Sequence, residues 1–113
     1  MNNVALIGNL CTDVELKEIA DDKKLARFLL AVDRPGQASG ADFVWIVAWD
    51  RQAETCARFL AKGKRVGIDG RLRSRSWEVD GKKRDLVEVH ANRVQFLSPA
   101  DVAAAVERAE AVA

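Results

Sequence analysis

Two long alternating stretches joined by a tight turn dominate the second half of the chain. Residues 64–79 and 84–97 alternate between apolar and polar side chains, which is the period of two typical of β-strands. Asp80 and Gly81 lie between them, and this dipeptide favours the two-residue turn of a β-hairpin because both positions tolerate a positive φ. The pattern predicts a long β-hairpin.

Shorter strand-like segments precede it. They cover residues 4–10, 14–19, 25–33 and 42–50. We expect 14–19 to continue the first strand after a break at Thr12-Asp13. Residues 51–63 are predicted to be helical, because their apolar side chains recur at steps of three and four residues and Gly63 is typical of a helix stop.

Five strands with one helix between the third and the fourth is the layout of an all-β Greek-key barrel, the oligonucleotide-binding (OB) fold. The chain has 113 residues, which suits one domain with its own core. We predict an OB domain over 1–97 and a short helical or flexible extension over 98–113, since Ser98 and Pro99 are typical of a helix start.

The strand predicted over 42–50 carries large rings on one face. With a period of two, Phe43, Trp45 and Trp49 share a face with Val47, and the smaller Val44, Ile46 and Ala48 occupy the other. The small side chains indicate a core face. The rings either stack on ligand bases or pack against a partner subunit, and the second alternative weighs most for Trp49.

A row of arginines follows in the first strand of the long hairpin. Arg71, Arg73 and Arg75 alternate with small or apolar residues and lead to Trp77. Residues 61–97 carry ten Lys/Arg and five Asp/Glu, a local net charge of +5 in a chain whose total is +1. Arginines that contact phosphates, beside rings that stack on bases, favour binding of single-stranded nucleic acid. The alternative without a ligand is a solvent-exposed strand whose charges keep the edge of the sheet from pairing with another chain.

Other function classes find little support in the sequence. The adjacent Asp21 and Asp22 suit a hairpin tip better than a metal site, and His90 has no second ligand at metal spacing, so we expect a core or interface histidine. The spacing of Cys11 and Cys56 suits neither a metal nor a redox motif. We predict no enzymatic activity, cofactor, metal or membrane span, and a cytoplasmic, nucleoid-associated protein.

Several motifs together resemble the bacterial single-stranded DNA-binding protein family. They are "MNNVALIGNL", "FLLAVDRP", "ADFVWIVAWDRQAE", "FLAKGKRVGIDGRLRSRSW" and "VQFL", which run in family order from Met1 to about Leu97. The resemblance implies sequence-independent binding and protection of single-stranded DNA in replication, repair or recombination. It also implies a homotetramer built as a dimer of dimers.

The resemblance and the residue patterns together nominate a set of DNA-binding residues. These are Phe43, Trp45, Trp49, Trp77, Arg71, Arg73, Arg75, Lys62, Arg34 and Asn9. Trp45 departs from the family pattern, which usually has a polar or basic residue there, and Arg27 and Leu29 stand where small polar residues are common.

The end of the chain departs as well, because the family usually continues into a Gly/Pro-rich tail with an acidic tip. We therefore expect a short form in which tail-mediated protein partners are absent. The alternative function is a primosome-type OB protein that binds both DNA and a partner protein.

Overall fold

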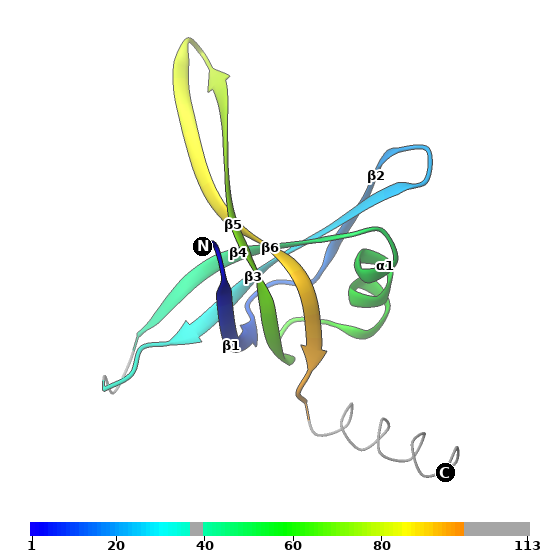
Figure 1. The fold of residues 1–113 in the computed structure, drawn as a ribbon, viewed down its shortest axis with the longest axis vertical. Helices are drawn as coiled ribbons and strands as arrows, with labels where there is room; N and C mark the ends of the chain where they lie inside the picture. The colour runs from blue at the N-terminus through cyan, green and yellow to red at the C-terminus, as the bar shows by residue number, and fades with distance from the viewer. Residues whose placement is uncertain (37–39, 99–113) are drawn as a thin grey trace.

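The computed structural model describes residues 1–36 and 40–98 (Figure 1). Its elements are β1 (Val4–Leu10), β2 (Glu15–Ala20), β3 (Lys23–Asp33), β4 (Ala41–Trp49), α1 (Asp50–Phe59), β5 (Arg65–Val79) and β6 (Lys82–Phe96). Residues 37–39 and residues 99–113 of the predicted extension lie outside the described residues. The predicted domain division stays a prediction.

The strands form one closed sheet. Their order is β1-β5-β6-β4-β3-β2, and β1 also pairs with β3, which closes the ring. The β4–β6 pair is parallel and the other pairs are antiparallel. Because β1 and β2 are two parts of one bent path interrupted at residues 11–14, the ring has five strand paths. The predicted OB fold is confirmed.

Two hairpins project beyond the body of the barrel (Figure 1). The β5–β6 ladder runs from Val66↔Phe96 to Val79↔Lys82, and Asp80 and Gly81 close it with φ of 53° and 76°. Positive φ at both positions is the geometry of a type I′ turn, as the sequence predicts. The β2–β3 hairpin turns at Asp22, whose φ of 62° is also positive.

The barrel core consists of the alternating apolar side chains that point inward. Phe28 and Leu30 of β3 and Ile46 and Ala48 of β4 are completely buried, so the predicted core face of β4 is correct, although Val44 is only half-buried. Val47, on the face with the rings, is nevertheless buried. It is paired with Arg27 on one side and His90 on the other, and these side chains cover it.

The helix is shorter than the sequence predicts. It ends at Phe59 because Leu60 is already extended, with φ −104° and ψ 148°, and its side chain is buried in the core. Gly63, the predicted helix stop, lies in the following turn, where its N–H donates to the Leu10 carbonyl at 2.9 Å. The helix packs Ala53 and Cys56 on the barrel, and burial raises the pKa of the Cys56 thiol to about 11.

A β-bulge in β6 changes which side chains face outward. Asp69 pairs with Arg93 and Gly70 with Ala91, so Asn92 is the extra residue. The predicted strict alternation is therefore wrong at Arg93, which is exposed. Gln52 of α1 braces the bulge: its Nε2 donates to the Ala91 carbonyl at 3.2 Å, and its Oε1 accepts from the Val94 N–H at 3.1 Å.

Candidate nucleic-acid interface

One outer face of the barrel collects the predicted rings and arginines. The strand register places Arg27, Val47, His90 and Arg71 in one row across β3, β4, β6 and β5. Side chains two positions away on each strand continue the same face. We call it the aromatic–arginine face, and it contains Trp45, Trp49, Arg71, Arg73, Arg75 and Trp77. Segments far apart in the sequence thus present the predicted rings and cations together.

A cavity of about 370 Å³ lies in the middle of this face. It is lined by Lys17, Leu25, Arg27, Val47, Trp49, Arg73, Ser74, Arg75, Glu88 and His90. Because Lys17 comes from β2 and Arg73–Arg75 come from β5, the cavity lies between the two projecting hairpins. OB folds usually bind oligonucleotides on the face of their second and third strands, which are β3 and β4 here, and on the adjoining loops.

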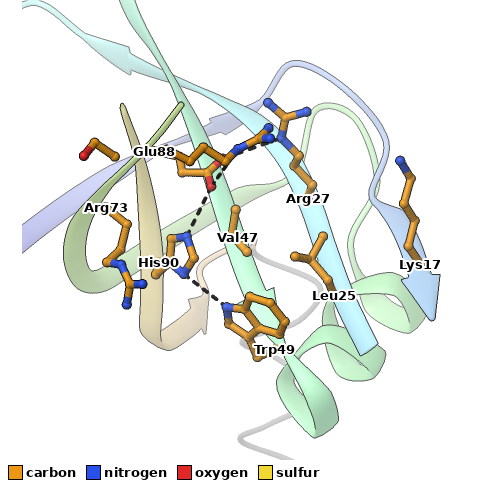
Figure 2. A pocket seen from close by; sticks show the side chains of 10 residues that line it. Lys17, Leu25, Arg27, Val47, Trp49, Arg73, Glu88 and His90 are labelled. Carbon is orange, nitrogen blue, oxygen red and sulfur yellow. Dashed lines mark hydrogen bonds and ion pairs between the residues drawn. The ribbon is translucent and has the colours of Figure 1, made fainter. Parts of the chain in front are cut away.

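Trp49, His90 and Glu88 form a chain of hydrogen bonds on the cavity wall (Figure 2). The Trp49 indole Nε1–H donates to His90 Nδ1 at 3.1 Å, so Nδ1 is an acceptor and the neutral ring carries its proton on Nε2. That nitrogen lies 3.2 Å from Glu88 Oε1 and donates to it. Both His90 and Glu88 are buried, but His90 lines the cavity on the outer face and does not belong to the barrel core. Of the predicted core or interface position, the core alternative is therefore wrong, and the interface alternative stays a prediction.

Glu88 is a buried carboxylate on a face of positive charge. Its Oε1 lies 3.4 Å from Arg75 Nε, and its Oε2 lies 3.9 Å from Arg27 Nε. Only 7% of the Glu88 side chain is exposed, compared with 50% for Arg75 and 26% for Arg27. An ionised carboxylate is rarely buried without such partners, and two arginines and a histidine surround this one.

The same two arginines lie over tryptophan rings. The Arg27 guanidinium is 4.0 Å from the centroid of Trp45, and that of Arg75 is 4.8 Å from the centroid of Trp77. Both distances are within the range of cation–π attraction. Trp45 and Arg27 both depart from the family pattern, and the structure shows that these two departures contact each other.

Arg71 and Arg73 complete the predicted row in different ways. Arg71 is half-buried, and its Nη1 donates to Asn92 Oδ1 at 2.7 Å. Arg73 is exposed and pairs in register with Glu88, but Figure 2 shows its guanidinium turned away from that carboxylate. Within residues 1–36 and 40–98, Arg73 makes no ion pair or hydrogen bond, so its charge is available to a ligand.

The other nominated residues lie away from the cavity. Phe43 is 63% exposed on β4, and the register connects it through Ala31 to Asn9 of β1. Both ends of the Asn9 amide are used, because Nδ2 donates to the Gly63 carbonyl and Oδ1 accepts from Arg65.

Lys62 and Arg34 carry the remaining nominated charges. Lys62 is exposed beside Gly63 in the turn after α1. Arg34 is paired with Asp42 at 2.9 Å, so part of its charge is already neutralised.

Sequence reasoning did not nominate Arg27, Glu88, His90 or Lys17 for this face. The alternation of β6 does put Glu88 and His90 on one side of the strand, and an acidic residue between such apolar neighbours is a signal of burial with partners. The identity of those partners depends on the strand order. β6 pairs with β4 as well as with β5, its neighbour in the sequence.

Comparisons with known proteins identify the family of the chain. A profile of the Single-strand binding protein family matches residues 1–97. "Single-stranded DNA-binding protein 3" of Clostridium acetobutylicum is 45% identical over 102 residues, which cover 86% of this chain and 71% of the relative. The "Single-stranded DNA-binding protein" of Clostridium tetani is 45% identical, with coverages of 86% and 70%. "Single-stranded DNA-binding protein A" of Bacillus subtilis is 44% identical over 104 residues, with coverages of 88% and 60%.

The chain belongs to the single-strand binding protein family. The resemblance predicted from the motifs is thereby confirmed. In this family member, no group of three or more His, Cys, Asp or Glu side chains within the described residues could hold a metal ion. No helix in that part of the chain is long and apolar enough to cross a membrane.

Proposed function

We propose that the protein binds single-stranded DNA without reading its sequence, through the aromatic–arginine face. The observation that carries the proposal is the row of strands β4, β6 and β5, which brings the three tryptophans of the chain and the row of arginines to one face beside the cavity. In the cell, such a protein covers and protects exposed single strands during replication, repair or recombination, and associates with the nucleoid.

The proposed chemistry divides between two kinds of side chain. Rings stack on bases, and because every base has a π-face the contact is tolerant of sequence. Trp49 and Trp77 are 37% and 39% exposed, so each has ring surface left for a base. Arginines hold the phosphates by charge, which makes the affinity depend strongly on salt. Within the row of Arg71, Arg73 and Arg75, Arg73 is the arginine whose charge is least occupied by other described residues.

A titration with single-stranded and duplex DNA tests the proposal. Intrinsic tryptophan fluorescence should fall as poly(dT) is added, because stacked bases quench indoles they contact. Duplex of equal length should bind far more weakly at moderate salt, since its bases are already stacked with one another. Equal affinity for the two forms would contradict the proposal. The control is single-stranded poly(dA), which should also quench, because stacking requires no particular base.

We also propose that the protein assembles as a homotetramer, a dimer of dimers. Exposed apolar side chains support it, because Ile7 of β1 and Val87 of β6 are 53% and 57% exposed, and burial of apolar surface favours association. Sedimentation at micromolar concentration should give a species of four chains. A single species at the mass of one 12.4 kDa chain would contradict the assembly without affecting the proposal of DNA binding.

No catalytic activity is part of the proposal. The chemistry on the face is that of binding: cations, rings and one buried carboxylate already paired with arginines. Nothing on this face favours the alternative of a primosome-type protein with a dedicated protein partner. Incubation with labelled single-stranded DNA and Mg²⁺ should leave the strand intact, and cleavage would require an enzymatic function instead.

A further inference from the structure

Glu88 has three partners, and each of them leads to a different tryptophan. His90 connects it to Trp49 by hydrogen bonds of 3.2 Å and 3.1 Å. Arg75 connects it to Trp77, and Arg27 connects it to Trp45, each through an ion pair with the carboxylate and a guanidinium over the ring. The chain has three tryptophans in all, so one side chain is linked to every one of them.

We propose that Glu88 is a positioning residue that sets the orientation of all three tryptophans on the aromatic–arginine face. The proposal rests on the proposed function and deepens it. Glu88 itself need not touch DNA, because its carboxylate is buried beneath the residues that it holds. Its effect on binding passes through His90, Arg27 and Arg75.

The first link fixes the Trp49 indole. His90 accepts from the indole through Nδ1 only when its proton is on Nε2, and Glu88 Oε1 accepts a hydrogen bond from that Nε2–H. The carboxylate therefore selects the tautomer that can hold the indole. The Trp49 and His90 rings lie 6.0 Å apart at an interplanar angle of 36°, so hydrogen bonding rather than parallel stacking orients Trp49.

The other two links fix the guanidiniums. Arginine side chains lose considerable rotamer freedom when they are held in one place, and a half-exposed Arg75 would not stay over Trp77 without a second contact. The buried carboxylate supplies that contact for Arg75 at 3.4 Å. Arg27 lies 3.9 Å away and is held by charge attraction, because its Nε and Glu88 Oε2 make no hydrogen bond. The carboxylate also neutralises part of their charge, so we expect Arg27 and Arg75 to contribute less to phosphate binding than their number suggests.

Two effects on DNA binding follow when the Glu88 charge is removed. The tryptophans lose their orientation, which weakens the salt-independent part of the affinity. Arg27 and Arg75 are released toward phosphates, which strengthens the salt-dependent part. A plot of log K against log salt separates the two effects, because released cations change its slope and lost stacking changes its intercept at high salt.

The experiment compares Glu88→Gln and Glu88→Asp with the wild type and with a control. Glu88→Gln should lower the affinity for poly(dT) extrapolated to 1 M salt by about tenfold, within the range for one base–aromatic stack. Its salt slope should become steeper by about 1.4, twice the single-strand value of ~0.7 per phosphate. Glu88→Asp keeps the charge but moves it back by one methylene, away from His90 and the arginines. The intercept, which is log K extrapolated to 1 M salt, should therefore fall with little change in the salt slope.

The matched control is Glu78→Gln, which removes an exposed carboxylate from the same hairpin. Glu78 pairs in register with Lys83 and lies on the opposite side of β5 from Arg75 and Trp77. Its substitution should leave the intercept unchanged. Near-ultraviolet circular dichroism of the free proteins gives a readout without DNA: the tryptophan bands should change in both Glu88 variants and remain the same in the control.

Each outcome decides the proposal. Folded Glu88 variants with the intercept and tryptophan bands of the wild type would overturn it. If Glu88→Gln does not fold, Glu88→Asp decides alone: a lower intercept at constant slope supports the proposal, and an unchanged intercept overturns it. If the wild type fails to bind poly(dT), the proposed function is wrong, and the tryptophan bands still test whether Glu88 orients the rings.

Discussion

Arg73→Ala isolates the contribution of one phosphate contact. Arg73 is exposed on β5 and makes no ion pair or hydrogen bond within the described part of the chain. Its removal should therefore leave the packing of the face intact, unlike removal of Arg75, which is tied to Glu88 and Trp77. If Arg73 neutralises one phosphate, its loss should appear in the salt dependence of binding.

The magnitude follows from counterion release. One fewer neutralised phosphate reduces the slope of log K against log salt by about 0.7 for a single strand. Over a tenfold increase in salt, the affinity deficit of Arg73→Ala relative to the wild type should then shrink by about fivefold, which corresponds to ~1 kcal/mol. At high salt the two proteins should bind almost equally.

Tryptophan quenching by poly(dT), measured at four or more salt concentrations, gives both slopes because Arg73→Ala keeps every indole. Arg58→Ala is a suitable control, since Arg58 lies in the last turn of α1 over Phe59 rather than on the aromatic–arginine face. Its slope should equal that of the wild type. A folded Arg73→Ala protein with the wild-type slope would refute the assignment of Arg73 to a phosphate.

Three further substitutions test other parts of the structure. Trp77→Ala should cost about 1–3 kcal/mol of binding, the usual range for one stack, with little change in slope; unchanged affinity in calorimetry would remove Trp77 from the interface. Gly70→Ala should lower the free energy of unfolding, measured in urea, by about 1–3 kcal/mol, because an added Cβ would lie 2.3 Å from the His90 carbonyl oxygen. An unfolding midpoint equal to that of the wild type would show that the backbone at the bulge shifts to make room at little cost. Cys56 has its pKa raised by burial from 9.0 to about 11, so the folded state keeps the neutral thiol while the unfolded state ionises above pH 9. The wild type should accordingly lose about 2 kcal/mol of stability between pH 9 and 11 relative to Cys56→Ala, and parallel pH profiles would contradict this.

The local features of the fold could be predicted from the sequence because they depend on neighbours along the chain. Alternation gives each strand, and Asp80-Gly81 gives the turn of the long hairpin with its two positive φ angles. The end of the helix could not be predicted in this way. Leu60 leaves the helical conformation because its side chain is buried in the barrel core, and that is a tertiary contact which outweighs the local preference for Gly63 as a stop.

The bulge at Asn92 is a second feature that local pattern missed. Alternation along β6 predicts that Arg93 shares a side with Val89 and Ala91, but the extra residue moves it to the exposed side. The bulge is stabilised by Gln52, which lies 40 residues earlier in the chain and bonds to the backbone on both sides of it. The residues near Asn92 in the sequence therefore could not predict the bulge, because the contact that stabilises it comes from Gln52.

The sequence by itself determined the class of fold, the family, and the two rows of rings and arginines, because each of these depends on residue type and spacing along single strands. Only the tertiary structure decided which charges remain available and which are already engaged. Arg73 and Arg75 look equivalent in the row, yet Arg75 is held by Glu88 and Arg73 is not. The physical reason is that an ion pair requires two groups within about 4 Å, and the pairing of β6 with both β4 and β5, together with the burial of Glu88, sets which groups meet.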